Sequence, residues 1–459
     1  MKKSSLALVA FVIITIAAVL SVMQNYNLVA LPEMALAVAR WAGIAVLLLF
    51  AYQKKSLTTW ILVSMVVGAE IGYSFPDFAQ NLNVLSKIFL KLVKTIIAPL
   101  VFATLVVGIA GHSNLKQVGS MGAKALIYFE VVTTIALFIG LLAINLSRAG
   151  DGIELKGEIS NEIKAAEPQT WSDIILHIFP ENIAKSIAEG QVLQIVVFSV
   201  LFGIGLAMLN ERKRRPLLEV TESLAETMFK FTNIIMYFAP IAVGAALAYT
   251  VGHMGFGILV NLFKLLATLY LALIAFLLLV LLPVALAFRI PIKMFVQAIA
   301  EPVSIAFATT SSEAALPRAM EAMESIGVPR KIVAFVMPMG YSFNLDGSTL
   351  YLSLASIFVA QAAGIEMSWE QQLLMVFTLM LTSKGIAGVP RASLVILLGT
   401  AASFNLPVWP IFIILGIDEL MDMARTSVNV IGNCLATAVI ARWEGEFVDL
   451  DAPRPIESV

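Results

Sequence analysis

Long apolar runs separated by short polar segments make up most of the chain. A transmembrane helix needs about 20 mainly apolar residues, and several of these runs reach that length. The pattern predicts two helices between Ser5 and Tyr52, followed by helices or broken segments at 58–75, 84–111, 120–148, 171–210, 217–250 and 257–289. We therefore expect an all-α polytopic membrane protein.

The amino terminus begins like a secretory signal, with Lys2 and Lys3 before an apolar run. That run approaches a full membrane span, no Ala-x-Ala site follows it, and a second apolar segment covers 34–52. We expect an extra transmembrane helix pair within 1–55. Cleavage of a signal peptide is the alternative.

Basic residues in short loops indicate the orientation in the membrane. Lys54, Lys55 and the run 211–215 mark the cytoplasmic side, whereas the acidic segment 151–167 marks the external side. The polar segment 445–459 is expected to be a disordered cytoplasmic tail.

The last third of the chain contains two interrupted apolar segments, at 293–325 and 370–404. Small or helix-breaking residues interrupt them at Ala308–Pro317 and Ser383–Pro390. Two such segments, alternating with longer ones at 332–361 and 408–442, suggest paired re-entrant hairpins around a transport site. A pair of kinked ordinary helices is the alternative.

A polar stripe crosses the last apolar segment. Asp418, Asp422, Arg425, Asn429 and Asn433 follow one another at steps of three or four residues, which places them on one face of a helix. Charges persist at membrane depth mainly where they meet a cavity, a partner or a solute. The stripe therefore predicts a functional site; an ion pair that only holds helices together is the alternative.

The first hairpin carries Thr310-Ser311-Ser312-Glu313, which fits a capping box with Thr310 as N-cap and Glu313 at the third helical position. A helix beginning there would direct free N–H groups at an anion. Structural capping alone accounts equally well for Glu313, so the serine hydroxyls are the better candidates for binding.

Asn344, Asp346 and Gly347 interrupt an apolar helix within Gly340–Tyr351. Unwinding there would free backbone carbonyls beside two side chains with hard oxygen ligands for a small cation. Ordinary turn chemistry is the alternative.

Arg425 offers two parallel donors to a carboxylate, and Asp422 could receive an ammonium group. Together they point to an acidic amino acid.

Composition narrows the class of protein further. Of the 459 residues, 59% are hydrophobic and only 13% are charged, so a soluble domain is excluded. A net charge of −1 gives no reason to expect a nucleic-acid partner. The single cysteine, Cys434, excludes a disulfide framework. Because no nucleophile–base grouping is apparent, we do not expect an enzyme.

NLDGSTLY, SKGIAGVP and DMARTSVNVIGN, in this order after a serine-rich hairpin, resemble the dicarboxylate/amino acid:cation symporters, the glutamate transporter family. The resemblance covers Trp60 to Glu444 and excludes the extra helix pair. It implies eight family transmembrane helices and two re-entrant helical hairpins in a homotrimer. Helices within 56–250 would form mainly a trimerising scaffold, and 251–444, with helix 120–148, a transport domain that moves as an elevator.

The resemblance also implies residue roles. Arg425 would bind the side-chain carboxylate of the substrate and Asp422 its amino group, which favours glutamate or aspartate. The other positions expected to line the substrate are Thr426, Asn429, Ser311, Ser312, Ser348, Val389 and Ser393, the last two in a second hairpin that acts as the gate.

The sequence departs from that of sodium-coupled family members at positions that bind the cation in those members. Asn433 stands where those members have an aspartate, and Phe129 and Val132 replace oxygen-bearing side chains. The segment IYFEVVTTIAL, with Glu130 at membrane depth, instead resembles proton-coupled bacterial glutamate carriers. Glu130 could carry the proton, because a carboxyl group that loses its hydration binds a proton more readily. The positions expected to take part in coupling are Glu130, Asp346, Asn344, Gly340 and Asn433.

We therefore expect a bacterial cytoplasmic-membrane symporter for acidic amino acids, coupled to protons and without a cofactor other than the co-transported cation. A sodium-coupled carrier for the same solutes, or for C4-dicarboxylates, is the closest alternative. An anion channel is the alternative from another class.

Overall fold

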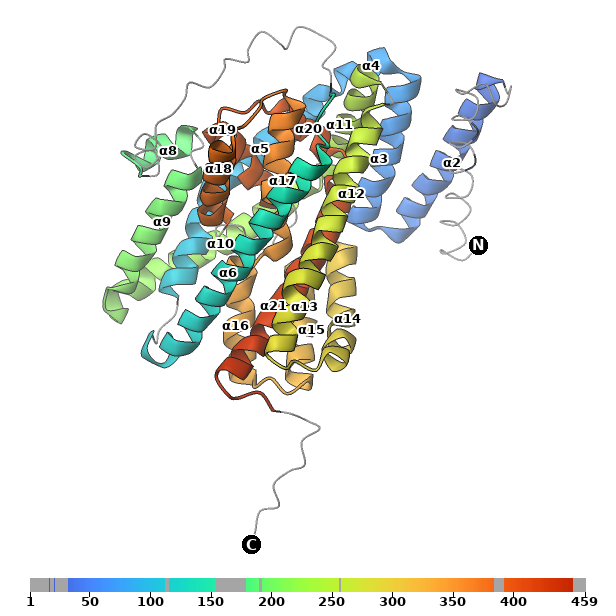
Figure 1. The fold of residues 1–459 in the computed structure, drawn as a ribbon. Coiled ribbons are helices and arrows are strands. Elements are labelled where there is room, and N and C mark those ends of the chain that lie inside the picture. Colours follow the sequence, from blue (N-terminus) through green and yellow to red (C-terminus); the bar gives the residue numbers. More distant parts are fainter. Residues whose placement is uncertain are drawn as a thin grey trace.

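The computed structural model describes residues 16, 20, 32–111, 115–153, 179–189, 192–255, 257–383 and 392–448. All regular elements among them are helices (Figure 1). The α-helices are α2 (Glu33–Lys54), α3 (Leu57–Ser74), α4 (Pro76–Asn81), α5 (Asn83–Ala110), α6 (Leu115–Ser147), α8 (Ile183–Glu189), α9 (Val192–Ala207), α10 (Glu211–Met236), α11 (Ala239–Met254), α12 (Ile258–Phe276), α13 (Leu282–Ala287), α14 (Ile292–Thr309), α15 (Ser312–Ser325), α16 (Arg330–Phe343), α17 (Asp346–Ala362), α18 (Trp369–Thr382), α19 (Ala392–Ser403), α20 (Trp409–Leu415) and α21 (Asp418–Trp443).

The helices have the length and apolarity of a polytopic membrane protein. Six spans in the described part are long and apolar enough to cross a bilayer, or seven if the bent pair α10 and α11 counts as one span. Of the predicted amino-terminal pair, only α2 falls among the described residues. The tail beyond residue 448 and the acidic segment from residue 154 to residue 167 lie outside them.

Three predicted helices are divided in the structure. The expected helix 217–250 is two helices, α10 and α11, which meet at 50°; Pro240 in the first turn of α11 lacks the N–H that a continuous helix would need there. The expected helix 408–442 is α20 and α21, separated at Gly416 and Ile417. The expected helix 257–289 passes through a π-helical turn, Leu277–Leu281, between α12 and α13.

Both interrupted segments form helix pairs. The first consists of α14 and α15, which pack against each other across a turn at Thr310 and Ser311. The second consists of α18 and α19, which are also in contact, although the residues between them, 384–391, lie outside the described part. The expected interruption at 332–361 is confirmed, since α16 ends at Phe343 and α17 begins at Asp346.

The buried helix α17 lies at the centre of the carboxyl-terminal half. It packs along α6 and also contacts α21, α19, α18 and α12. The Ser353 hydroxyl donates to the Leu137 carbonyl of α6 at 2.8 Å. A side chain at Gly140 would collide with the Leu350 carbonyl, so this glycine permits the close approach of α6 and α17. Helix α6 is thereby joined to the hairpins and late helices.

Helix α2 is fastened to α3 by a buried ion pair. The Arg40 Nε lies 3.0 and 2.8 Å from the two Glu70 carboxylate oxygens, and the Ser74 hydroxyl donates to the same carboxylate at 2.7 Å. Glu70 is 8% exposed and Arg40 15%. The Arg40 guanidinium also lies over the Tyr73 ring. The charges are therefore balanced within the apolar layer.

Replacing Glu70→Gln should destabilise the protein by about 3–5 kcal/mol, because Arg40 would remain buried without its counter-charge. Thermal unfolding of the purified protein in detergent measures the change. The control is Glu219→Gln, which breaks the exposed Arg215 pair and should cost about 0–1 kcal/mol. Equal effects of the two substitutions would show that the Arg40–Glu70 pair does not hold α2.

Candidate functional site

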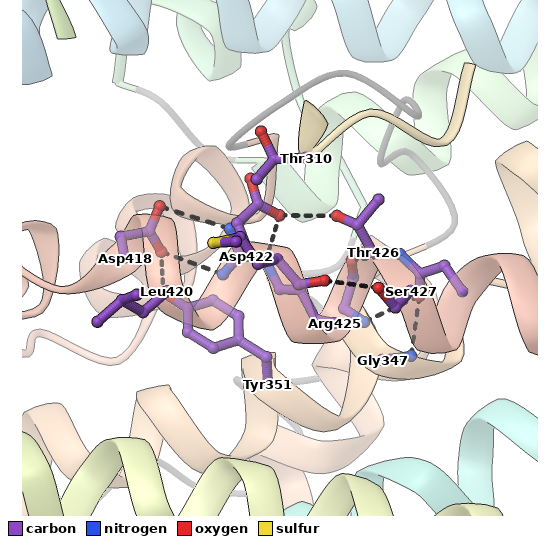
Figure 2. Close-up of polar contacts among 12 residues, drawn as sticks. Thr310, Gly347, Tyr351, Asp418, Leu420, Asp422, Arg425, Thr426 and Ser427 are labelled. Atoms are coloured by element: carbon purple, nitrogen blue, oxygen red, sulfur yellow. Dashed lines mark hydrogen bonds and ion pairs between the residues drawn. The ribbon is translucent and has the colours of Figure 1, made fainter. Parts of the chain in front are cut away.

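The Arg425 guanidinium is the centre of the polar stripe on α21 (Figure 2). Its side chain is completely buried. The Nε donates to Asp422 Oδ1 at 2.8 Å, one helical turn away, and Nη1 donates to Asp418 Oδ1 at 3.1 Å. The spacing of three and seven residues places both carboxylates on the same face as the guanidinium. The predicted convergence of the stripe is thus present, with Asp418 as a second ionic partner.

An aromatic ring from α17 closes the other side of this arginine. The Arg425 guanidinium carbon lies 4.1 Å from the Tyr351 ring centroid, a favourable cation–π distance. The Tyr351 hydroxyl donates to Asp418 Oδ1 at 3.3 Å. On the opposite side, the Thr426 hydroxyl donates to Asp422 Oδ1 at 3.0 Å. Two helices therefore fix the direction of the guanidinium.

Asn429 joins α21 to the start of α17. Its Oδ1 accepts from the Gly347 and Ser348 backbone N–H groups at 2.8 and 3.1 Å, and its Nδ2 donates to the Ser348 hydroxyl at 2.9 Å. The first N–H groups of a helix have no partner within the helix, and here Asn429 provides one. Asn429 and Ser348 thus form one buried network beside the stripe, whereas Thr426 belongs to the network of Asp422 and Arg425.

The first hairpin meets α21 with its turn region shifted by one residue from the prediction. The predicted N-cap of α15 is Thr310; in the structure Ser311 caps this helix, accepting from the Ala314 N–H at 3.3 Å. Thr310 adopts a left-handed conformation at the end of α14, which is incompatible with the extended backbone of an N-cap. Ser312 is buried at the start of α15, which contacts α21.

In the second hairpin, Ser393 is buried near the start of α19. Val389 lies outside the described residues, so its expected contact with the substrate stays a prediction.

A second polar cluster lies where α16 is interrupted. Asn344 Nδ2 donates to Asp346 Oδ2 and to Asn433 Oδ1, both at 3.4 Å, and all three side chains are almost fully buried. Asn344 Oδ1 and Asn433 Nδ2 have no hydrogen-bond partner among the described residues. An atom added at Gly340 would collide with Asn433 Oδ1. The positions predicted to hold a cation are therefore adjacent.

Helix α6 packs beside this cluster with Phe129 and with Tyr128, which interacts electrostatically with Asp346. The buried Phe129 ring lies close to Gly340, 3.5 Å from the point that a Cβ atom on this glycine would occupy, and Val132 is also buried. The Thr133 hydroxyl donates to the Phe129 carbonyl of its own helix at 2.7 Å. Glu130 is half-buried on α6, and its expected depth in the membrane stays a prediction.

A comparison with known protein families shows the family of this chain. The family model described as "Sodium:dicarboxylate symporter family" matches residues 57–443. The chain belongs to this family. Its members are transporters, not enzymes, and the match leaves α2 outside.

Curated relatives agree over most of their length. The chain is 42% identical to a proton/sodium-glutamate symport protein of Geobacillus stearothermophilus, over 86% of this chain and 96% of the relative. It is 43% identical to a proton/glutamate-aspartate symporter of Escherichia coli, over 86% and 94%. A C4-dicarboxylate transport protein of Laribacter hongkongensis is 41% identical, over 88% and 94%.

Sequence reasoning assigned no role to Asp418 beyond membership of the stripe and none to Tyr351. The spacing of seven residues between Asp418 and Arg425 was visible, and it allows an ion pair across two helical turns. Nothing in the sequence indicated Tyr351, because its ring reaches Arg425 only through the packing of α17 on α21.

Gly347→Ala should destabilise this symporter by about 1–3 kcal/mol, because the added methyl group would collide with the Arg425 backbone of α21. The control is Gly205→Ala in α9, where an added carbon meets nothing within 4 Å and alanine favours the helix. Thermal unfolding of both purified variants tests this. A Gly347 variant as stable as the Gly205 variant would contradict the tight contact.

Proposed function

We propose that this symporter imports acidic amino acids, L-glutamate or L-aspartate, across the bacterial cytoplasmic membrane. The observation that carries the proposal is the buried arrangement of Asp422, Arg425 and Asp418 on one face of α21. A solute with a carboxylate and an ammonium group satisfies both kinds of charge. The names of the glutamate and aspartate relatives support the same substrate class.

Asp418 accepts from the same Arg425 donors that a substrate carboxylate would use. Its two oxygens lie 3.1 and 3.5 Å from Nη1 and Nη2 of Arg425, which is a two-donor arrangement. When the substrate enters, its side-chain carboxylate takes these donors and its ammonium group binds Asp422. Ser348 of α17 and Ser393 of α19 then surround the main-chain carboxylate, together with Thr426, Asn429, Ser311 and Ser312. The Arg425–Asp418 ion pair is thereby replaced by an ion pair between Arg425 and the substrate.

The proposed moving unit consists of α12–α21 together with α6. The packing of α6 along α17, with the Ser353–Leu137 hydrogen bond, supports its movement with the hairpins. Helices α3, α5, α10 and α11 would form the scaffold of a homotrimer, along which this unit slides as an elevator. The second hairpin, α18 and α19, would be the gate.

Protons are the proposed coupling ion. A sodium site needs several oxygen ligands around the ion, and Phe129 and Val132 of α6, at two positions where sodium-coupled members of the family have oxygen-bearing side chains, offer none. A proton needs only one carboxyl group. Glu130 is the first candidate carrier, with Asp346 and Glu313 in reserve.

A C4-dicarboxylate carrier is the second candidate, and the Laribacter relative favours it. Such a solute has no ammonium group to balance Asp422, whose carboxylate lies 2.8 Å from Arg425. Competition between excess succinate and labelled glutamate distinguishes the two. Succinate that displaces glutamate as well as aspartate does would favour the second candidate.

Arg425→Ala should abolish glutamate binding in the fraction of the variant that stays folded, because the substrate carboxylate would lose its two-donor partner at a cost of about 2–5 kcal/mol. Equilibrium binding of glutamate to the purified variant measures this, with size-exclusion chromatography as the folding control. Arg425→Lys keeps the charge but not the two parallel N–H donors of the guanidinium, and it should recover only part of the affinity. Near-normal affinity in the alanine variant would exclude the assignment.

Uptake into proteoliposomes should follow an inward proton gradient in sodium-free buffer. Glu130→Gln should abolish accumulation driven by pH but preserve exchange of internal for external glutamate, because exchange needs no net proton transfer. If the variant still concentrates glutamate with pH as the sole driving force, Glu130 is not the carrier. If wild-type uptake requires sodium, proton coupling is wrong.

A further inference from the structure

Helix α5 carries three lysines on one face. Lys87, Lys91 and Lys94 follow one another at steps of four and three residues, so their side chains lie in a line along the helix. All three are exposed in the protomer. We call Lys87, Lys91 and Lys94 the lysine stripe.

Within the parts of the chain that the structure describes, no carboxylate pairs with the lysine stripe. Helix α5 itself contains no acidic residue. The buried or partly buried arginines Arg40 and Arg425, in contrast, each have carboxylate partners. Unbalanced cations within a bilayer-length apolar helix persist where they meet water and an anion.

The stripe lies in the half of the bilayer from which a solute would enter. Helix α5 starts at Asn83 and has 28 residues, so the three lysines lie roughly 6 to 17 Å from its start at 1.5 Å per residue. Helix α3 begins beside Lys54 and Lys55 and ends at Ser74, just before α4 and α5. Figure 1 shows that α4 lies at one end of α3 and that α2 joins α3 at the opposite end. With Lys54 and Lys55 in the cytoplasm, the stripe is in the external half.

Helix α5 also contacts the proposed gate. It packs against α19, the arm of the second hairpin that carries the buried Ser393. The helix that carries the lysine stripe is therefore in contact with an element through which the substrate is proposed to pass.

We propose that the lysine stripe attracts acidic substrates from the external solution and guides them toward the second hairpin. The inference rests on the proposed acidic substrate. Long-range attraction raises the rate at which an anion reaches a site, and it weakens as salt screens the charges. The stripe adds no contact in the bound state, so it acts on the rate of capture and not on the maximal transport rate.

Anionic lipid is the other anion that such lysines could meet. Polybasic segments that bind anionic lipid lie at the cytoplasmic surface, and in this chain the run 211–215 at the start of α10 has that character. The lysine stripe extends along the helix axis into the apolar layer. This arrangement suits a small solute in a water-filled entrance better than a headgroup at the surface.

The test compares Lys87→Gln/Lys91→Gln/Lys94→Gln with wild type in intact cells, where the orientation is uniform. The initial rate of uptake is measured at glutamate concentrations well below saturation, at about 10 and about 300 mM ionic strength set with choline chloride. The Debye length falls from about 30 Å to below 8 Å over this range. A triple Lys→Arg variant keeps the charges. Arg212→Gln/Lys213→Gln/Arg214→Gln removes the same net charge from the opposite side.

We expect the triple glutamine variant to lose roughly tenfold in kcat/KM at low ionic strength, to approach wild type at high ionic strength, and to keep its maximal rate. Both control variants should behave like wild type. An equal loss at both ionic strengths, or no loss at either, would overturn the proposal.

Repeating the comparison in liposomes of phosphatidylcholine, with and without phosphatidylglycerol, tests whether the lysine stripe binds anionic lipid instead. A difference between the variants that appears only with the anionic lipid would overturn the proposal in favour of lipid binding. Glutamate binding at high ionic strength is measured in parallel. Its absence in wild type would refute the proposed function itself, independently of the stripe.

Discussion

A guanidinium buried in the middle of a membrane protein must be neutralised where it lies, and this constraint organises the carboxyl-terminal half of the chain. Burying one charge without its partner costs several kcal/mol. Arg425 meets the constraint with two carboxylates of its own helix, Asp418 and Asp422, and with the Tyr351 ring of α17. Because the ring comes from another helix, α17 and α21 must remain packed for the arginine to stay oriented.

The interruption before α17 is a consequence of the same packing. Ending α16 at Phe343 and starting α17 at Asp346 leaves backbone N–H groups without helical partners. Asn429, one turn beyond Arg425, accepts from two of them, and Gly347 allows the backbones to approach closely enough. The arginine, the asparagine and the helix break therefore form one unit, in which moving any part disturbs the others.

The sequence predicted those parts of the fold that depend on local pattern. The stripe on α21, the break at Asn344 and the two hairpin segments follow from spacing and from helix-breaking residues. The division at Gly416 was not predicted in this way; there α20 packs closely on Leu247 of α11, and a contact between helices distant in sequence is not visible in a local pattern. The cap at Ser311 was missed for a similar reason: Thr310 and Ser311 are equally good N-caps by composition, and the direction of the turn decides between them. The role of Tyr351 required the packing of two helices distant in sequence.

Charge balance gives a reason why substrate entry should require a cation. Helices α17 and α21 bury Asp346, Asp418, Glu419 and Asp422, but Arg425 is their only buried cation. When these groups are ionised, an acidic amino acid adds a further negative charge to a region that already has an excess of them. In a medium of low dielectric constant such an addition is strongly unfavourable. A cation that enters with the substrate removes the penalty, and this holds for a proton as for sodium. The balance of charge thus favours symport as such and does not distinguish between the two ions.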